Sequence, residues 1–396
     1  MDFDFSPDQQ QLKEQTRRYL ADHCSSLAVR AVLDGPQSHD AALWQGLGAQ
    51  GFLGAAVPEH LGGSGAGHLE LCVIAEELGR AVAPVPFSSS IGLAAEMLLR
   101  AGSSAQQQRW LPGLASGALI GTLALAEQPG RVQPGRIASS VQRGRLSGTK
   151  RPVADGDIAD IAIVATRDGA GDALSLHIVD LHAAGVQRSL LPGIDPTRSQ
   201  AEIVFSQAEA EPLGAAGAGA ALVSSALDRA AVLMAFEQVG GADKALQTAC
   251  DYAQERFAFG RPIGSMQAIK HMLADMYVSA TLARSNAYYG AWALSTDAPE
   301  LAQAAATARV SATQAYQHCA RNNIQVHGGM GFTWAFDCHL HYRRANALAL
   351  ALGSLGEWED RLVGHLVGQR KADRTTDRTT DRTTDRATDG TTQRAA

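Results

Sequence analysis

The sequence predicts an α+β protein of several domains, with an N-terminal α-helical domain, a middle antiparallel β-barrel or sandwich, and a C-terminal four-helix bundle. Three observations support this fold class. The chain has 396 residues, enough for roughly two to three domains. Hydrophobic residues make up 45% of it and charged residues only 19%, so it can bury sizeable cores. The hydrophobic pattern changes from helical spacing to short β-type runs and then back to long helical stretches.

Residues 1–118 are predicted to form the N-terminal helical domain. Ser6 and Pro7 mark a helix start, because serine caps a helix and proline fits its first turn. The apolar residues of 71–82 recur at helical spacing, and Pro84 follows them as a helix breaker.

Residues 119–212 are predicted to form the middle β domain. Short apolar or alternating runs are separated here by glycine, proline and aspartate, as in small antiparallel barrels and sandwiches. The runs are Leu119–Glu127, Ile161–Thr166, Leu174–Leu181 and Ala201–Phe205.

Residues 213–368 are predicted to form the C-terminal helical bundle. Three long stretches are nearly free of helix breakers: Ala220–Arg256, Met266–Leu294 and Leu301–His327. Residues 369–396 contain a DRTT repeat in which aspartate and arginine charges cancel. That segment lacks large apolar residues and is predicted to be disordered.

Composition limits the classes of function. The formal net charge is −6, from 34 basic and 40 acidic residues, which gives no reason to expect nucleic-acid binding. The N-terminus is too polar for a signal peptide, and the most apolar stretch, Ala215–Phe236, contains Asp228 and Arg229. We therefore expect a cytoplasmic protein with no membrane segment. The five cysteines are widely separated, so neither a metal site nor a disulfide framework is expected.

Two motifs suggest a ligand site. Residues 255–264 join two predicted helices through glycines and a proline, and Arg256 and Gln267 could bind a phosphate-bearing cofactor. A plain helix–loop–helix turn is the alternative. Residues 325–332, which read QVHGGMGF, end the next predicted helix. A helix C-cap needs only one glycine, whereas consecutive glycines let a backbone approach a ligand closely.

The combination RxxFGxxI…Q and QxHGGxGF, at this spacing in an α–β–α chain, resembles the acyl-CoA dehydrogenase family. The segments VPEHLGGSG at 57–65 and EELG at 76–79 also resemble that family, and the resemblance covers about residues 1–365. It implies FAD as cofactor and assembly as a dimer of dimers.

The resemblance implies that each FAD lies across a subunit interface. The middle domain of one subunit holds the flavin ring, and the C-terminal domain of its neighbour holds the diphosphate and adenosine. The residues of this chain that match the second set are Arg256, Phe259, Gly260, Gln267, Gln325, Gly328 and Gly329.

The family's chemistry requires a glutamate that removes the α-proton of an acyl thioester while FAD accepts a hydride from the β-carbon. The glutamate stands at one of two places, which correspond here to Leu352 and Ala230. Neither side chain can accept a proton. The flavin-contacting segments of the middle domain also depart from the family: Ala126 replaces a threonine, and 150–156 lacks the family's tryptophan.

The chain thus lacks both the catalytic glutamate and the family's flavin-contacting residues of the middle domain. It keeps the residues that match the diphosphate and adenosine half of the FAD site. The chain is therefore similar to the glutamate-lacking subunit of heterotetrameric (α2β2) acyl-CoA dehydrogenases that act on steroid side chains. This implies a homologous catalytic partner, an acyl-CoA substrate with a steroid-derived or other bulky acyl group, and an electron-transfer flavoprotein or similar acceptor.

Three alternatives remain from the sequence. The chain could be a self-sufficient homotetrameric dehydrogenase with Glu237 as the base, seven residues after Ala230 on the same predicted helix. Seven residues span about 10 Å along a helix, so such a base would need a different substrate pose. The fold could also serve as a non-catalytic scaffold, or as a flavin hydroxylase, which can dispense with the glutamate.

Overall fold

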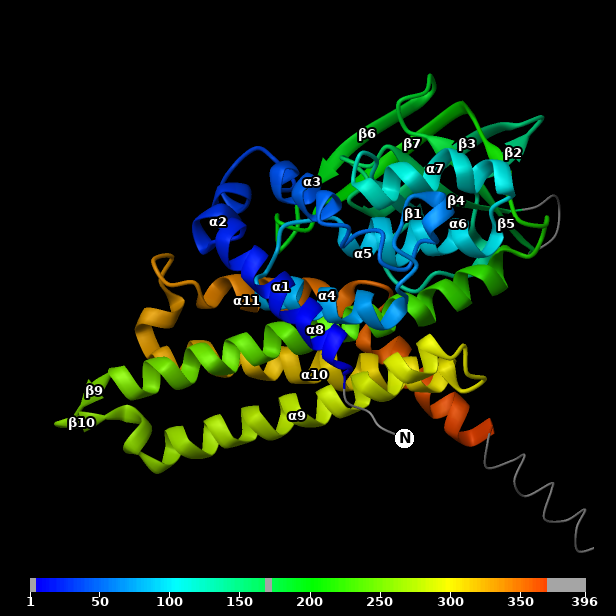
Figure 1. Ribbon diagram of the computed structural model, residues 1–396. Coiled ribbons are helices and arrows are strands. Elements are labelled where there is room, and N and C mark those ends of the chain that lie inside the picture. Colours follow the sequence, from blue (N-terminus) through cyan, green and yellow to red (C-terminus); the bar gives the residue numbers. More distant parts are fainter. Residues whose placement is uncertain (1–4, 168–172, 369–396) are drawn as a thin grey trace, which may run out of the picture.

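The computed structural model describes residues 5–167 and 173–368. The predicted disordered segment at 369–396 lies outside this part of the chain. Figure 1 shows the sheet and most of the N-terminal helices packed together above a bundle of long helices. This arrangement confirms the predicted fold class: an N-terminal helical domain, a middle sheet and a C-terminal helical bundle.

The N-terminal domain consists of helices. Ser6 caps the first one through a capping box with Gln9, as the Ser6-Pro7 pair predicted. Its elements are α1 (Pro7–His23), α2 (Ser26–Leu33), α3 (Ala41–Ala49), η1 (Glu59–Leu61), α4 (His68–Arg80), α5 (Phe87–Ser89), the π-helix η2 (Ser90–Ala95), α6 (Glu96–Ala101) and α7 (Ser104–Ser116).

The middle domain is one eight-stranded sheet in the order β6-β7-β3-β2-β4-β5-β8, with β1 paired to β4. Its strands are β1 (Gly121–Ala124), β2 (Ser140–Gln142), β3 (Arg145–Ala154), β4 (Ile161–Arg167), β5 (Leu174–Asp180), β6 (Val186–Leu191), β7 (Gln200–Glu209) and β8 (Glu211–Leu213).

The sheet is mixed, which corrects the prediction of a wholly antiparallel domain. β1 and β2 both pair with β4 in parallel, whereas the remaining pairs are antiparallel. The physical reason is the connection: β2 and β3 intervene between β1 and β4, so no tight turn forces those two strands to run in opposite directions.

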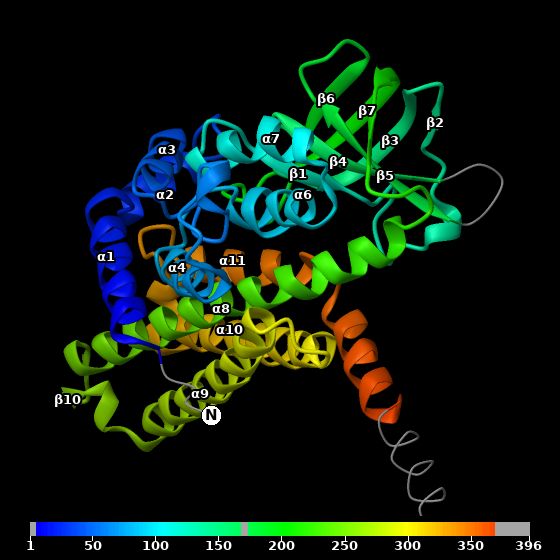
Figure 2. The same cartoon turned by 45° about the vertical axis from the view of Figure 1, so that its right-hand side comes forward.

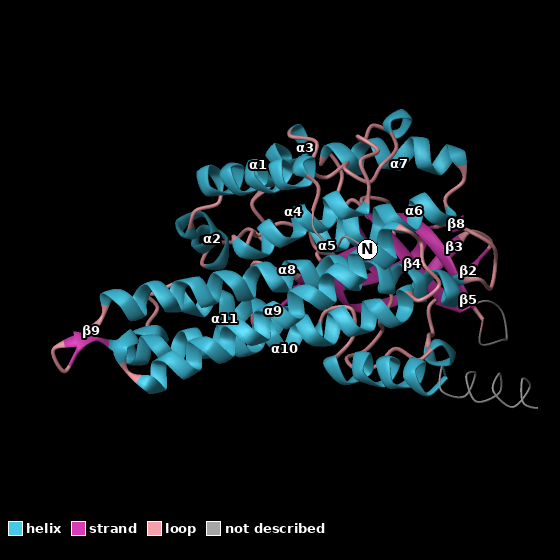
Figure 3. Ribbon diagram, turned by 60° about the horizontal axis from the view of Figure 1, so that its bottom comes forward, coloured by secondary structure: helices cyan, strands magenta, loops and turns pink. Residues whose placement is uncertain are grey.

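The C-terminal bundle contains α8 (Gly219–Glu255), α9 (Gln267–Ser295), α10 (Leu301–His327) and α11 (Cys338–Leu350). The views in Figures 1 and 3 show the long helices running side by side. A further helix covers 355–368 and extends away from the body of the protein (Figure 2). α8 is long and apolar enough to cross a membrane, but 67% of its most apolar window is buried inside the fold, as in the core helix of a globular protein.

Two glycines let the N-terminal domain cross the bundle closely. A Cβ at Gly79 of α4 would lie 1.8 Å from the carbonyl oxygen of Glu237, and a Cβ at Gly240 of α8 would lie 1.8 Å from that of Glu76. The neighbouring carboxylates are buried and paired, Glu76 with Lys13 at 2.8 Å and Glu77 with Arg17 at 2.7 Å. The EELG segment therefore joins α4 to both α1 and α8.

Candidate cofactor site and the positions of the catalytic base

The two sequence motifs lie at the same end of the bundle. The hairpin of β9 (Phe257–Ala258) and β10 (Arg261–Pro262) joins α8 to α9, and the short helix η5 (Gly328–Phe332) follows α10. Tyr252, near the end of α8, stacks on His327, the last residue of α10, with 4.0 Å between the ring centroids. In Figure 1 the hairpin and the chain after α10 both lie at the left end of the bundle.

The hairpin owes its shape to local sequence. Ala258 pairs with Arg261, so Phe259 and Gly260 form a two-residue loop, with φ +51° and +76° respectively. Positive φ at both loop residues is the conformation of a type I′ turn, which glycine favours. The turn leaves the Phe259 ring 94% exposed at the tip.

The glycines after α10 present open backbone. Gly328 has φ +61°, and a Cβ built at Gly328 or Gly329 would meet no atom within 4 Å. Gly331 differs, because a Cβ there would lie 2.6 Å from the carbonyl oxygen of Ile324. Packing therefore requires the third glycine, whereas the first two leave room for a ligand beside their backbone.

The polar side chains at this end have free hydrogen-bonding capacity. Arg256, Gln267 and Gln325 are exposed, and no hydrogen bond or ion pair engages their side chains within 5–167 and 173–368. Gln267 also begins α9, whose N-cap Met266 makes no side-chain cap. A guanidinium, amide groups and an uncapped helix N-terminus are donors that suit a diphosphate. The donor set thus fits the dinucleotide half that the resemblance assigns to it.

Neither position of the expected base carries an acid. Leu352 follows α11 with φ +61°, and its side chain packs against all three hydrophobic cores. Ala230 lies on α8 and is 2% exposed. The turn at Leu352 is well supported, since the Trp358 indole donates to the Leu352 carbonyl oxygen at 3.1 Å.

Arg309 holds the C-terminal end of α11 just before this turn. Its guanidinium donates to the carbonyl oxygens of Leu348 and, at 2.8 Å, Ala351. A cation at a helix C-terminus is favourable because the unpaired carbonyl groups there are negative. Complete burial lowers the pKa of Arg309 to about 10, although Glu237 opposes the shift.

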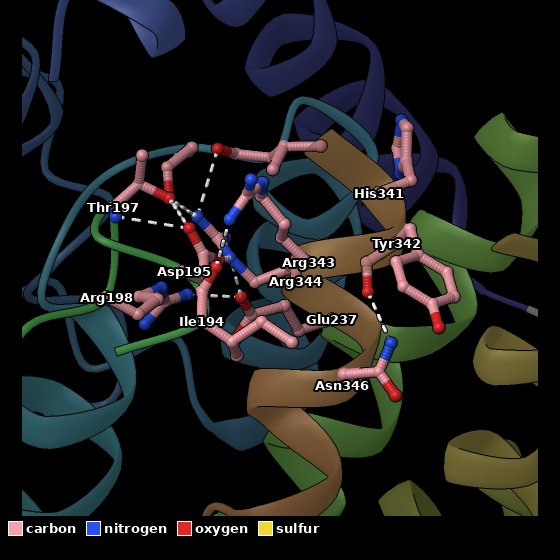
Figure 4. Close-up of polar contacts among 12 residues, drawn as sticks. Ile194, Asp195, Thr197, Arg198, Glu237, His341, Tyr342, Arg343, Arg344 and Asn346 are labelled. Carbon is pink, nitrogen blue, oxygen red and sulfur yellow. Dashed lines mark hydrogen bonds and ion pairs between the residues drawn. The ribbon is translucent and has the colours of Figure 1, made fainter. Parts of the chain in front are cut away.

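Glu237 lies inside a buried ionic network, which Figure 4 shows. Its Oε1 accepts hydrogen bonds from Arg198 and, at 3.4 Å, from Arg344. The Glu237 residue is only 2% exposed, and Arg344 is fully buried. Glu237 therefore has two cationic partners and is almost completely shielded from solvent by the described residues.

The same network joins three parts of the fold. Arg344 of α11 donates to Asp195 at 2.7 Å, to Thr197 at 2.8 Å, and to the carbonyl oxygens of Val82 and Ala83. Burial alone would raise the pKa of Asp195, but the charge of Arg344 together with hydrogen bonds from Arg344 and Thr197 outweighs it, so the net shift is downward. The sequence does not predict this network, because nothing in it links Arg344 to Asp195, which lies 149 residues earlier in the chain.

The middle domain has its own buried pair where the family places flavin contacts. Lys150 is fully buried and donates to Glu127 at 2.9 Å and to the carbonyl oxygen of Leu125 at 3.2 Å. Burial would raise the pKa of Glu127, but hydrogen bonds from Ser139, Ala138 and Lys150 lower it to about 2. These charges are satisfied within the chain. Among the described residues, no group of three or more His, Cys, Asp or Glu side chains could hold a metal ion.

Comparison with known proteins places this geometry in a family. Residues 6–118 match the model of the acyl-CoA dehydrogenase N-terminal domain, and residues 217–356 match that of the acyl-CoA dehydrogenase C-terminal domain. The chain belongs to the acyl-CoA dehydrogenase family. This is a family of oxidoreductases that generally use FAD, and the resemblance seen in the sequence is thereby confirmed.

The similar proteins include a steroid acyl-CoA dehydrogenase and a complex of two different chains. Acyl-CoA dehydrogenase IpdE2 of Mycobacterium tuberculosis is 35% identical over 356 residues, which cover 90% of this chain and 96% of the relative. A structure described as a Tcur3481-Tcur3483 steroid ACAD variant is 30% identical, with a TM-score of 0.83 and coverage of 92% and 99%. The ChsE4-ChsE5 complex from Mycobacterium tuberculosis is 29% identical, with a TM-score of 0.83 and coverage of 93% and 99%.

Proposed function

We propose that this chain is a subunit of an FAD-dependent acyl-CoA dehydrogenase and completes the FAD site of a homologous catalytic partner. The observation that carries the proposal is a contrast within the chain. The donors at the bundle end are free and open to a ligand, whereas both base positions carry apolar residues, Leu352 and Ala230. Such a chain can serve another subunit's cofactor without itself removing a substrate proton.

The bundle end would hold the diphosphate and adenosine half of FAD. Arg256 would pair with the diphosphate, and Gln267 and Gln325 would donate amide hydrogen bonds. Gly260, Gly328 and Gly329 would leave room for the cofactor beside their backbone, with the exposed Phe259 ring at the rim. When bound, FAD supplies the hydride acceptor for α,β-desaturation of an acyl-CoA thioester.

A homologous partner would supply the glutamate and the site of the flavin ring. Support comes from similar structures that contain two different chains by name, ChsE4-ChsE5 and Tcur3481-Tcur3483. The same neighbours, together with the steroid description of one of them, favour a steroid-derived or other bulky acyl group as the substrate. We further propose that electrons leave through an electron-transfer flavoprotein or similar acceptor. A cytoplasmic location is part of the proposal and is consistent with the burial of α8.

The position of Glu237 favours a subunit that depends on a catalytic partner over a self-sufficient enzyme with Glu237 as its base. A general base must come within hydrogen-bond reach of the proton that it abstracts. Glu237 is buried and bound to Arg198 and Arg344, so reaching a substrate would require breaking the network. We therefore assign Glu237 to the stability of the fold.

The test is the amount of FAD bound per chain. The full-length protein is purified alone and again with a co-expressed homologue that carries the glutamate, and flavin is measured by absorbance. We expect little FAD in the lone chain and one FAD per two chains in the complex. One FAD per chain in the lone protein would refute the shared site.

Substitutions identify the residues involved. Arg256→Ala and Gln267→Ala should each reduce FAD in the complex, while the two chains still co-purify. Arg261→Ala is the matched control, because Arg261 is exposed on the same hairpin but lies outside the assigned set. Equal loss of FAD in all three variants would contradict the residue assignment.

A further inference from the structure

His327 lies in an aromatic cluster beside the two open glycines at the end of the bundle. It is the last residue of α10 and directly precedes Gly328. Its ring stacks on Tyr252 with 4.0 Å between the centroids, and the ring of Phe336 lies edge to face at 5.8 Å. His327 is only 5% exposed. Two aromatic neighbours and near-complete burial therefore hold the imidazole in one position.

A hydrogen bond fixes which nitrogen of this ring carries the proton. Nδ1 of His327 lies 2.8 Å from the carbonyl oxygen of Asn323. Because a carbonyl oxygen only accepts, Nδ1 must be the donor. Burial lowers the pKa of His327 below its ordinary value of 6.5, although the same hydrogen bond opposes the shift. The ring is therefore neutral at neutral pH, and its Nε2 lone pair is available as an acceptor.

Nε2 is the nitrogen of His327 that has no partner. No hydrogen bond or ion pair within 5–167 and 173–368 engages it, and it is not one of the fully enclosed unpaired atoms. The residues that follow leave open space, since a Cβ at Gly328 or Gly329 would meet no atom within 4 Å. An acceptor that is fixed, unpaired and next to open space suits a ligand that donates a hydrogen bond.

The other groups proposed for the cofactor half mainly suit its diphosphate. The Arg256 guanidinium can only donate, and so can the uncapped N-terminus of α9. The oxygens of a diphosphate only accept, so these donors match them. The adenosine part of FAD differs, because its two ribose hydroxyls and its adenine amino group all donate hydrogen bonds. A neutral imidazole supplies the fixed acceptor that one of these groups requires.

We propose that Nε2 of His327 accepts a hydrogen bond from the adenosine part of FAD and thereby positions the cofactor in the shared site. The inference rests on the proposed function, because it needs the cofactor at this end of the bundle. A purely structural histidine would use only Nδ1 and the faces of its ring. A buried acceptor also gives specificity, because an analogue without the matching donor leaves that acceptor unpaired.

Competition on the assembled complex tests this hydrogen bond from the ligand side. The full-length chain is purified with its co-expressed homologue, and ADP is titrated as a competitor of FAD. Released FAD is measured by its absorbance after ultrafiltration. The titration is repeated with 2′-deoxy-ADP, 3′-deoxy-ADP and inosine diphosphate, each of which lacks one of the three donors. We expect one of these analogues to compete about 2- to 10-fold less well than ADP, the effect of one hydrogen bond.

His327→Phe identifies the acceptor. Phenylalanine keeps a ring that can stack on Tyr252 but removes both nitrogens, so the difference between ADP and that analogue should disappear. Phe336→Leu is the matched control, because it disturbs the same aromatic cluster and leaves Nε2 in place. The difference should persist in this control. Each comparison is made within one variant, so a loss of stability affects both nucleotides alike.

Two results would overturn the proposal: a difference that persists in His327→Phe, or equal competition by all four nucleotides in the parent complex. Arg256→Ala separates these results from a failure of the proposed function. If Arg256→Ala lowers bound FAD while the four nucleotides compete equally, the cofactor lies at this end of the bundle and His327 has only a structural role. A parent complex without FAD, or unchanged FAD in Arg256→Ala, would contradict the proposed cofactor site and this inference with it.

Discussion

Replacing Glu237 with glutamine separates the two roles considered for this carboxylate. In the parent protein its charge is shared between Arg198 and Arg344, both of which are buried. The amide keeps the shape and an acceptor oxygen but removes the negative charge. The carboxylate of Asp195, which accepts a hydrogen bond from Arg344, then remains to balance the guanidinium groups of Arg198 and Arg344.

The expected result is a loss of stability. Removing one partner of a buried ion pair costs about 3–5 kcal/mol, because it leaves an uncompensated charge in a poorly polarisable interior. We expect the lower part of that range, since the glutamine oxygen still accepts one hydrogen bond. Urea unfolding can be followed by tryptophan fluorescence, for which the buried Trp44 and Trp358 are suitable reporters.

Asp195→Asn is the matched control. Asp195 belongs to the same network and binds Arg344 at 2.7 Å, but no catalytic role is considered for it. Both variants should lose similar stability, and the fraction that assembles with the partner should keep its turnover per bound FAD. If Glu237→Gln were as stable as the parent and bound FAD without any turnover, Glu237 would be the base and the reasoning above would fail.

Three further predictions follow from the packing and the charges. Leu352→Glu should restore no turnover to the lone chain, and turnover without a partner would contradict this. In urea unfolding the variant should be less stable than the parent by about 2 kcal/mol or more, because a carboxylate would enter the junction of three apolar cores. Glu127 has a folded pKa of about 2, below its ordinary value of 4.5, so its stabilising effect is complete above pH 4.5 and disappears as pH falls toward 2. Glu127→Gln should therefore flatten the acid side of a plot of melting temperature against pH, and an unchanged slope over that interval would count against it. Gly240→Ala should lower the melting temperature by an amount equivalent to about 1–3 kcal/mol, because its Cβ would press on the Glu76 carbonyl oxygen. Gly356→Ala is the control, since its Cβ would meet no atom within 4 Å, and it should be neutral or slightly stabilising.

The long helices of the bundle could be predicted from sequence to within a residue. The expected stretches Ala220–Arg256, Met266–Leu294 and Leu301–His327 became Gly219–Glu255, Gln267–Ser295 and Leu301–His327. Such helices are determined locally, by unbroken apolar periodicity and by the glycines and prolines that end them. The two-residue loop at Phe259 and Gly260 is local in the same way.

Contacts between distant segments required the tertiary structure. The parallel pairing of β1 with β4 depends on how the chain returns across the sheet, and strand alternation carries no information about that. The network is similar: Asp195 and Arg344 are 149 residues apart, and each one alone reads as an ordinary charged residue.

The same division applies to the candidate site. The sequence by itself determined the family resemblance, the residues proposed for the cofactor half and the absence of an acid at 230 and 352, because short motifs and residue identities carry that information. Only the tertiary structure decided that Glu237 is enclosed between two arginines and that Leu352 lies at the junction of three cores. Burial and charge pairing arise only when distant segments fold together. The role of an acidic or apolar residue depends on both, so its identity in the sequence does not determine that role.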